Sequence, residues 1–153
     1  MPVENLFGED PEDTRLLKSM AVDAEEYLRA FAWCQSVEER YFGVGIGGIV
    51  AIFLFGIVPD RARVDEWLWV VVGDLPSAYL VTDDCKLPSE ALEGYIAEMR
   101  KWVRLAKAGR TSPAVIPVNV PATAEWAKEL EGRLSFLKKN ILPRFRDDEV
   151  QRA

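Results

Sequence analysis

The chain has 153 residues, of which 49% are hydrophobic and 29% are charged; this composition is typical of a folded domain and excludes a disordered one. The formal net charge of -6 disfavours binding to nucleic acid or to an anionic membrane surface, because both need clustered lysine and arginine. The absence of histidine excludes Ser-His-Asp and Cys-His catalytic sets, and we expect neither a metal nor another cofactor.

The first predicted helix runs from about residue 11 to residue 36. Asp10 suits the N-cap and Pro11 suits the first helical position. Apolar residues recur at helical spacing along one side: Leu17, Met20, Ala24, Tyr27, Leu28 and Phe31. The residues before this helix are acidic and do not resemble a signal peptide, so we expect a cytoplasmic protein with free thiols at Cys34 and Cys85.

An uncharged run from Tyr41 to Val58 comes next, and its β-branched and aromatic side chains predict a strand. The polar loop after it is too short for a parallel crossover, so a second apolar run, Trp67–Val72, should pair with the first as an antiparallel hairpin. Neither run alternates polar with apolar residues. Both faces of the hairpin must therefore be covered, by helices or by a partner chain.

Gly73 and Pro76 should end the second strand, and a short third strand is predicted over Ala78–Thr82. Pro88 begins a second predicted helix, for which Gly109 is the expected C-terminal cap.

Three prolines predict an extended loop over residues 110–121. A third helix is predicted from about residue 122 to residue 140, and Pro143 should stop it. The charged tail that begins at Arg144 is expected to fray, as are the first ten residues.

Together these elements predict one α+β domain over residues 1–153. A small antiparallel sheet of two or three strands should pack against about three amphipathic helices.

Two other interpretations of the run Tyr41–Val58 are disfavoured. Gly43, Gly45 and Gly48 fit the spacing G-x-G-x-x-G, but a dinucleotide-binding turn needs a strand before it and a helix after it, and the predicted order here is the reverse. A strand entry or a bulge explains these glycines more simply. A membrane helix needs about 20 apolar residues, and the run is slightly short and rich in residues that favour strands.

Six residues in and after the second apolar run form the candidate surface for a ligand or partner: Trp67, Trp69, Asp74, Tyr79, Asp83 and Asp84. The two tryptophans share one strand face and would mark a partner surface if exposed. The three aspartates fall in one loop region, where carboxylates could hold Mg²⁺ or Ca²⁺ or act as an acid–base pair. Ordinary turn chemistry explains the aspartates more simply.

Parts of the chain resemble a family of small bacterial proteins of unknown function. The resemblance rests on Gly47–Phe55, on Trp69–Leu80 and on the helix that carries Tyr95, Met99 and Trp102. It falls between Tyr41 and Gly109, about half of the chain. It implies a bacterial origin and a shared fold, and it implies no activity and no catalytic residue.

The acidic charge and the lack of a recognisable catalytic set favour a non-enzymatic module that binds a basic protein, as an inhibitor or immunity protein would. One alternative is a small-ligand or metal-dependent protein that uses the acidic loop from Asp74 to Asp84. Another is a structural subunit that pairs with copies of itself, for example as a homodimer.

Overall fold

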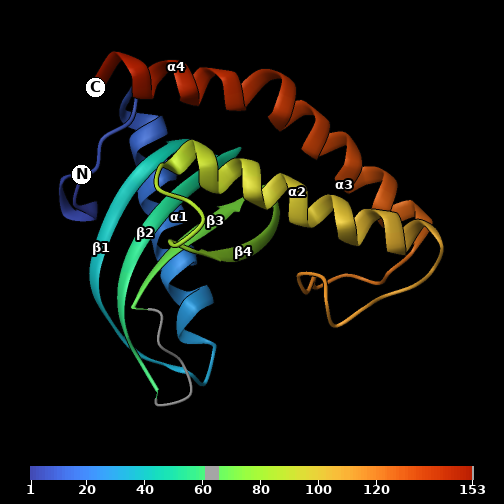
Figure 1. Cartoon of the computed structure of the whole chain (residues 1–153). Helices are drawn as coiled ribbons and strands as arrows, with labels where there is room; N and C mark the ends of the chain where they lie inside the picture. Colours follow the sequence, from blue (N-terminus) through green and yellow to red (C-terminus); the bar gives the residue numbers. More distant parts are fainter. Residues whose placement is uncertain (61–65, 153) are drawn as a thin grey trace. The chain divides into compact units, whose positions relative to one another are not determined.

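The structure is a computed structural model that describes residues 1–60 and 66–152. Contacts divide the chain into two compact units, Met1–Ala91 and Leu92–Ala153, and each is described by itself. Among the described residues, the N-terminal unit holds one α-helix and four strands, and the C-terminal unit holds most of a second helix and a long interrupted third (Figure 1). The α+β class is confirmed, whereas a single domain over the whole chain stays a prediction.

The first helix, α1 (Pro11–Arg29), begins where the sequence predicts. The Asp10 side chain accepts a hydrogen bond of 2.8 Å from the Asp13 backbone and caps the helix N-terminus. The helix ends at Arg29 rather than near residue 36, because Cys34 already pairs with Pro59 in the sheet. Pairing with a distant strand therefore overrides the local helical pattern.

The described residues form one four-stranded antiparallel sheet in the spatial order β1-β2-β3-β4: β1 (Cys34–Ile46), β2 (Val50–Pro59), β3 (Trp67–Gly73) and β4 (Leu75–Val81). The hairpin predicted between the two apolar runs is confirmed as β2–β3, and the predicted third strand is confirmed as β4. The prediction of two or three strands was wrong by one. The apolar run Tyr41–Val58 holds the end of β1 and nearly all of β2, not a single strand.

The glycine-rich stretch between β1 and β2 is a hairpin turn. Gly48 has a φ of +78°, a conformation that glycine adopts without strain. The Gly47 N–H donates a hydrogen bond of 2.7 Å to the Asp13 side chain and so ties the turn to α1. A strand follows this turn instead of a helix, so the glycine spacing is not that of a dinucleotide-binding turn.

Helix α1 covers one face of the sheet and forms the main core of the N-terminal unit. The buried cluster includes Leu17, Met20, Ala24 and Leu28 of α1 with Phe53, Phe55, Leu68 and Val70 of the central strands. Each fully buried leucine or phenylalanine stabilises the fold by about 1.5–3 kcal/mol. For this face, the expectation that a helix covers the sheet is confirmed.

One end of the opposite face is covered, within the N-terminal unit, by the segment that leads into the second helix. The Trp69 indole N–H donates a hydrogen bond of 2.8 Å to the Cys85 carbonyl. Pro88 packs on Gly43, where an added Cβ would come within 2.9 Å of the proline ring. The strand residues at this end of the face are buried: Val50, Ile52, Val71 and Ala78.

Both edges of the sheet carry features that limit pairing with other strands. β1 has three register shifts against β2, and such bulges bend an edge strand and interrupt its pairing. The second strand ends at Gly73 as predicted, but Pro76, which was also expected to end it, lies inside β4 beside a register shift. Proline has no N–H to donate and is tolerated in an edge strand of this kind.

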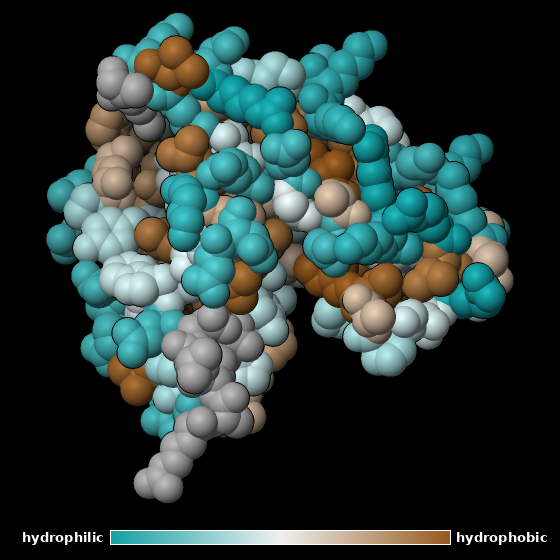
Figure 2. Space-filling view, in the orientation of Figure 1, coloured by the Kyte–Doolittle hydropathy of each residue, from teal (hydrophilic) through white to brown (hydrophobic). Residues whose placement is uncertain are grey.

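The second helix, α2 (Pro88–Lys107), begins at the predicted proline, and Gly109 follows its end with a φ of +68°. Figure 2 shows hydrophobic side chains gathered beside the C-terminal half of α2. Among the described residues, no helix combines the length and the apolar character that crossing a membrane requires.

The third predicted helix continues past Pro143 instead of stopping there. It comprises α3 (Ala124–Phe136), a π-helical turn (Leu137–Ile141) and α4 (Leu142–Arg152). The Leu142 N–H bonds to the Leu137 carbonyl, and this widened turn makes room for a proline ring that would clash in a regular α-helix. Beyond it, Phe145 is buried, and Arg146 pairs with Glu93 of α2 at 2.8 Å.

Candidate functional site

The two tryptophans predicted to share a strand face do share it, but their surroundings differ. Trp69 is 6% exposed, and its indole N–H is satisfied by the Cys85 carbonyl, so it is a core residue. Trp67 is half-buried and stays accessible. Cys34 and Cys85 form no disulfide, as predicted, and both are buried.

The three candidate aspartates are all exposed, but the structure does not bring them together. Asp74 lies in the turn between β3 and β4, whereas Asp83 and Asp84 lie in the turn after β4. Because a strand rises about 3.3 Å per residue, the seven residues of β4 separate the two turns by roughly 25 Å. Asp74 therefore cannot share an ion with the other two. Among the residues that the structure describes, no group of three histidine, cysteine or acidic side chains is placed to hold a metal.

Tyr79 faces α1, on the opposite side of the sheet from Trp67. Its ring lies 5.4 Å from Phe31 and 5.2 Å from Trp33, and these two rings stack at 4.9 Å. All three are partly buried against the main core. Burial raises the pKa of the nearby Tyr27 to about 12, although a backbone hydrogen bond from Tyr79 acts in the other direction. This cluster is best explained as the rim of the core.

Five side chains form a half-exposed apolar surface on the sheet face away from α1; we call it the sheet-face patch: Tyr41, Leu54, Val58, Trp67 and Leu80. The strand register explains it. Tyr41, Leu54, Trp69 and Leu80 are neighbours across the four strands, and Glu39, Gly56 and Trp67 form the next row.

Gly56 allows the Trp67 ring to lie close to β2, because an added Cβ would come within 3.0 Å of that ring. The Tyr41 and Trp67 rings are 6.2 Å apart. The patch is therefore an aromatic surface, and the Glu39 carboxylate lies in the same cross-strand row as Trp67.

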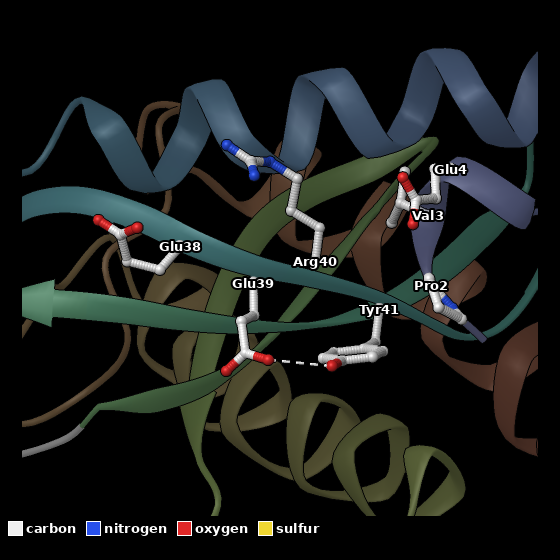
Figure 3. A pocket seen from close by; sticks show the side chains of 7 residues that line it. All are labelled: Pro2, Val3, Glu4, Glu38, Glu39, Arg40 and Tyr41. Carbon is white, nitrogen blue, oxygen red and sulfur yellow. Dashed lines mark hydrogen bonds between the residues drawn. The ribbon is translucent and has the colours of Figure 1, made fainter.

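A groove of about 430 Å³ borders the patch along the outer edge of β1; we call it the edge groove. It is lined by Pro2, Val3, Glu4, Glu38, Glu39, Arg40 and Tyr41. Figure 3 shows Arg40 directed toward α1, while Glu39 and Tyr41 project from the other side of the strand.

The edge groove is lined by more acidic than basic side chains. The Arg40 guanidinium is held by Glu25 of α1 through Nε and through Nη2, the latter at 3.1 Å, and the hydrogen bond from Arg40 is the main cause of a lowered Glu25 pKa. Tyr41 donates a hydrogen bond of 3.0 Å to Glu39, and this bond raises the Tyr41 pKa. With Arg40 engaged by α1, carboxylates dominate the groove, and this suits a cationic ligand.

The charge of the whole chain conceals a strong difference between the two units. Met1–Ala91 contains 17 acidic and 7 basic residues, a formal charge of -10, whereas Leu92–Ala153 contains 8 acidic and 12 basic residues, a formal charge of +4. The negative potential is thus concentrated on the unit that carries the patch and the groove.

Sequence reasoning missed Glu38, Glu39 and Tyr41. One signal was available, because the adjacent glutamates stand directly before the uncharged run that begins at Tyr41. The contribution of Pro2–Glu4 had no local signal, since it depends on a contact between distant segments.

Comparison with known proteins adds no relative: no family model matches the chain, and neither a curated protein nor a solved structure matches it.

Proposed function

We propose that the N-terminal unit is a non-enzymatic binding module for a basic protein, and that the sheet-face patch and the edge groove are its contact surface. The observation that carries this proposal is the half-exposed pair Tyr41 and Trp67 beside Glu39, on the sheet face away from α1. An inhibitor or immunity-like role in a bacterial cell is one biological form that such a module would take.

The apolar part of the surface supports affinity. Tryptophan and tyrosine are enriched among the residues that dominate binding energy at protein interfaces. A lysine or arginine placed over the Trp67 ring would gain a cation–π contact of about 0.5–2 kcal/mol and would also reach Glu39.

The charge supports rapid and selective encounter. With a formal charge of -10, the N-terminal unit attracts basic partners and repels acidic ones, and this attraction weakens as salt is added. Binding should therefore be fast at low ionic strength and fall steeply with salt.

A charge-swap comparison tests the proposal. The variant Glu38→Lys/Glu39→Lys changes the groove, whereas Asp23→Lys/Glu26→Lys makes the same change in total charge on exposed positions of α1. Pull-down from a bacterial lysate at low salt, read by quantitative mass spectrometry, should recover a basic protein with the wild type and the α1 variant and lose it with the groove variant. Equal recovery by all three chains would refute the proposal.

Self-pairing is the competing outcome. Light scattering of the wild-type chain and of Trp67→Ala would detect it, because a homodimer held through the patch should dissociate in that variant. A wild-type mass of two chains that falls to one chain in Trp67→Ala would mean that the patch binds a second copy of the chain, and that copy would then replace the basic protein in the proposal.

A further inference from the structure

The outer edge of β1 already pairs with an extended piece of chain. Pro2 forms an antiparallel bridge with Tyr41, and the Phe42 N–H donates a hydrogen bond of 2.7 Å to the Met1 carbonyl. After Pro2 the chain turns away as the short 3₁₀ helix Val3–Asn5. This edge therefore accepts strand pairing, and the groove begins where that pairing ends.

The backbone direction at the groove follows from this hydrogen bond. In an antiparallel pair, alternate residues direct both N–H and C=O toward one neighbour. Because the Phe42 N–H points away from β2, the N–H and C=O of Arg40 point away from β2 as well. No register shift separates Glu39 from Phe42, so the alternation holds across this section.

A bulge and the N-terminal residues set the length of the accessible section. A register shift lies between Val37 and Glu39, and on the other side Tyr41 and Phe42 are already paired with Pro2 and Met1, which leaves Glu39–Arg40 as the open regular section. Bulges protect an edge from open-ended pairing. A partner strand would thus find a short site of defined register rather than a surface that promotes aggregation.

The side chains beside this section select the sequence of the partner. On the patch face, an added strand would meet Glu39 as its cross-strand neighbour, because Tyr41 already faces Pro2, and opposite charges in such positions attract. On the α1 face it would meet Arg40, already bound to Glu25, so an uncharged side chain fits there. The pattern favoured is basic and uncharged residues in alternation.

We infer that the module recognises its partner by strand addition: an extended segment with lysine or arginine at alternate positions pairs with the outer edge of β1 at Arg40 and places its basic side chains beside Glu39 and Trp67. This inference rests on the proposed function and adds the mode of recognition. Main-chain hydrogen bonds supply affinity in this mode, and side-chain positions supply specificity.

The test is an NMR titration of the full ¹⁵N-labelled chain at low salt with an eight-residue peptide of alternating lysine and threonine. Amide shifts should concentrate in Glu38–Phe42, and hydrogen exchange of the Arg40 amide should slow by about tenfold or more at saturation, because it gains a hydrogen-bond partner.

Two further peptides isolate the contribution of backbone hydrogen bonds to binding. In an added strand, alternate N–H groups face β1 and the others face away, and each peptide is N-methylated on one of these two sets. Methylation of the set that faces β1 should weaken binding by about tenfold or more, and methylation of the other set should leave binding unchanged. All three peptides keep the same charge, so they act as matched controls.

The outcomes separate the inference from the proposed function. Equal binding of all three peptides, or an Arg40 amide whose exchange does not change in the presence of the unmodified peptide, would overturn strand addition. The proposed function would survive that result if lysate capture still depends on Glu38 and Glu39. If capture of the basic protein does not depend on Glu38 and Glu39, both strand addition and the proposed function are overturned.

Discussion

Replacing Trp69 with phenylalanine should destabilise the chain far more than the same replacement at Trp67. Trp69 is 6% exposed, and its indole N–H satisfies the Cys85 carbonyl at 2.8 Å. Losing that donor leaves a buried carbonyl without this partner, at about 1–3 kcal/mol, and the smaller ring adds roughly 1 kcal/mol of lost packing. We therefore expect a loss of about 2–4 kcal/mol for Trp69→Phe and less than about 1 kcal/mol for Trp67→Phe.

Urea unfolding followed by far-ultraviolet circular dichroism measures both variants. The Trp69→Phe midpoint should fall by about 1–2 M, and that of Trp67→Phe should stay close to the wild type. Comparable losses in the two variants would mean that the hydrogen bond to Cys85 does not distinguish the two rings, and the assignment of Trp67 to a binding surface would lose its structural basis.

Three further predictions concern stability. Gly132→Ala, inside α3 where the new methyl group enters open space, should raise the unfolding free energy by about 0.5–1 kcal/mol, whereas Gly48→Ala, at a φ of +78°, should lower it by about 1 kcal/mol; urea unfolding decides, and equal signs would contradict the reasoning. The lowered pKa of Glu25 means that its bond to Arg40 stabilises the fold above pH 4.5 and is lost as pH falls through the folded-state pKa, so Glu25→Gln should flatten acid unfolding below that pH. The raised pKa of Tyr27 means that stability present below pH 10 is lost as pH rises toward about 12, and Tyr27→Phe should remove this alkaline loss; an unchanged alkaline profile would refute it.

The proposed contact surface places two demands on the chain. The apolar patch requires Tyr41 and Trp67 to stay half-exposed, and the groove requires Glu38 and Glu39 to stay accessible to a basic segment. Neither demand involves the Ser-His-Asp or Cys-His catalytic sets that the absence of histidine excludes.

Local signals were sufficient for much of the fold. Proline at a helix start and glycine after a helix end correctly predicted α2, because these residues act through their own backbone conformations. The hairpin β2–β3 was also predictable, since two apolar runs joined by a short loop have only one simple way to pair.

The errors arose where a distant contact decided the conformation. The first helix was predicted to reach about residue 36, but Cys34–Ser36 belong to β1 because β2 supplies backbone partners. Pro143 is a helix breaker by its own chemistry, but the π-helical turn before it relieves the clash and allows α4 to form.

The candidate site shows the same division. The sequence by itself determined the absence of histidine chemistry, the acidic charge and the presence of two tryptophans on one strand face. Only the tertiary structure decided that Trp69 is buried under Cys85 while Trp67 stays accessible, and that β4 separates Asp74 from Asp83. The edge groove likewise joins Pro2–Glu4 to β1, and such a contact is invisible to any local pattern because it depends on how the chain returns to a distant part of itself.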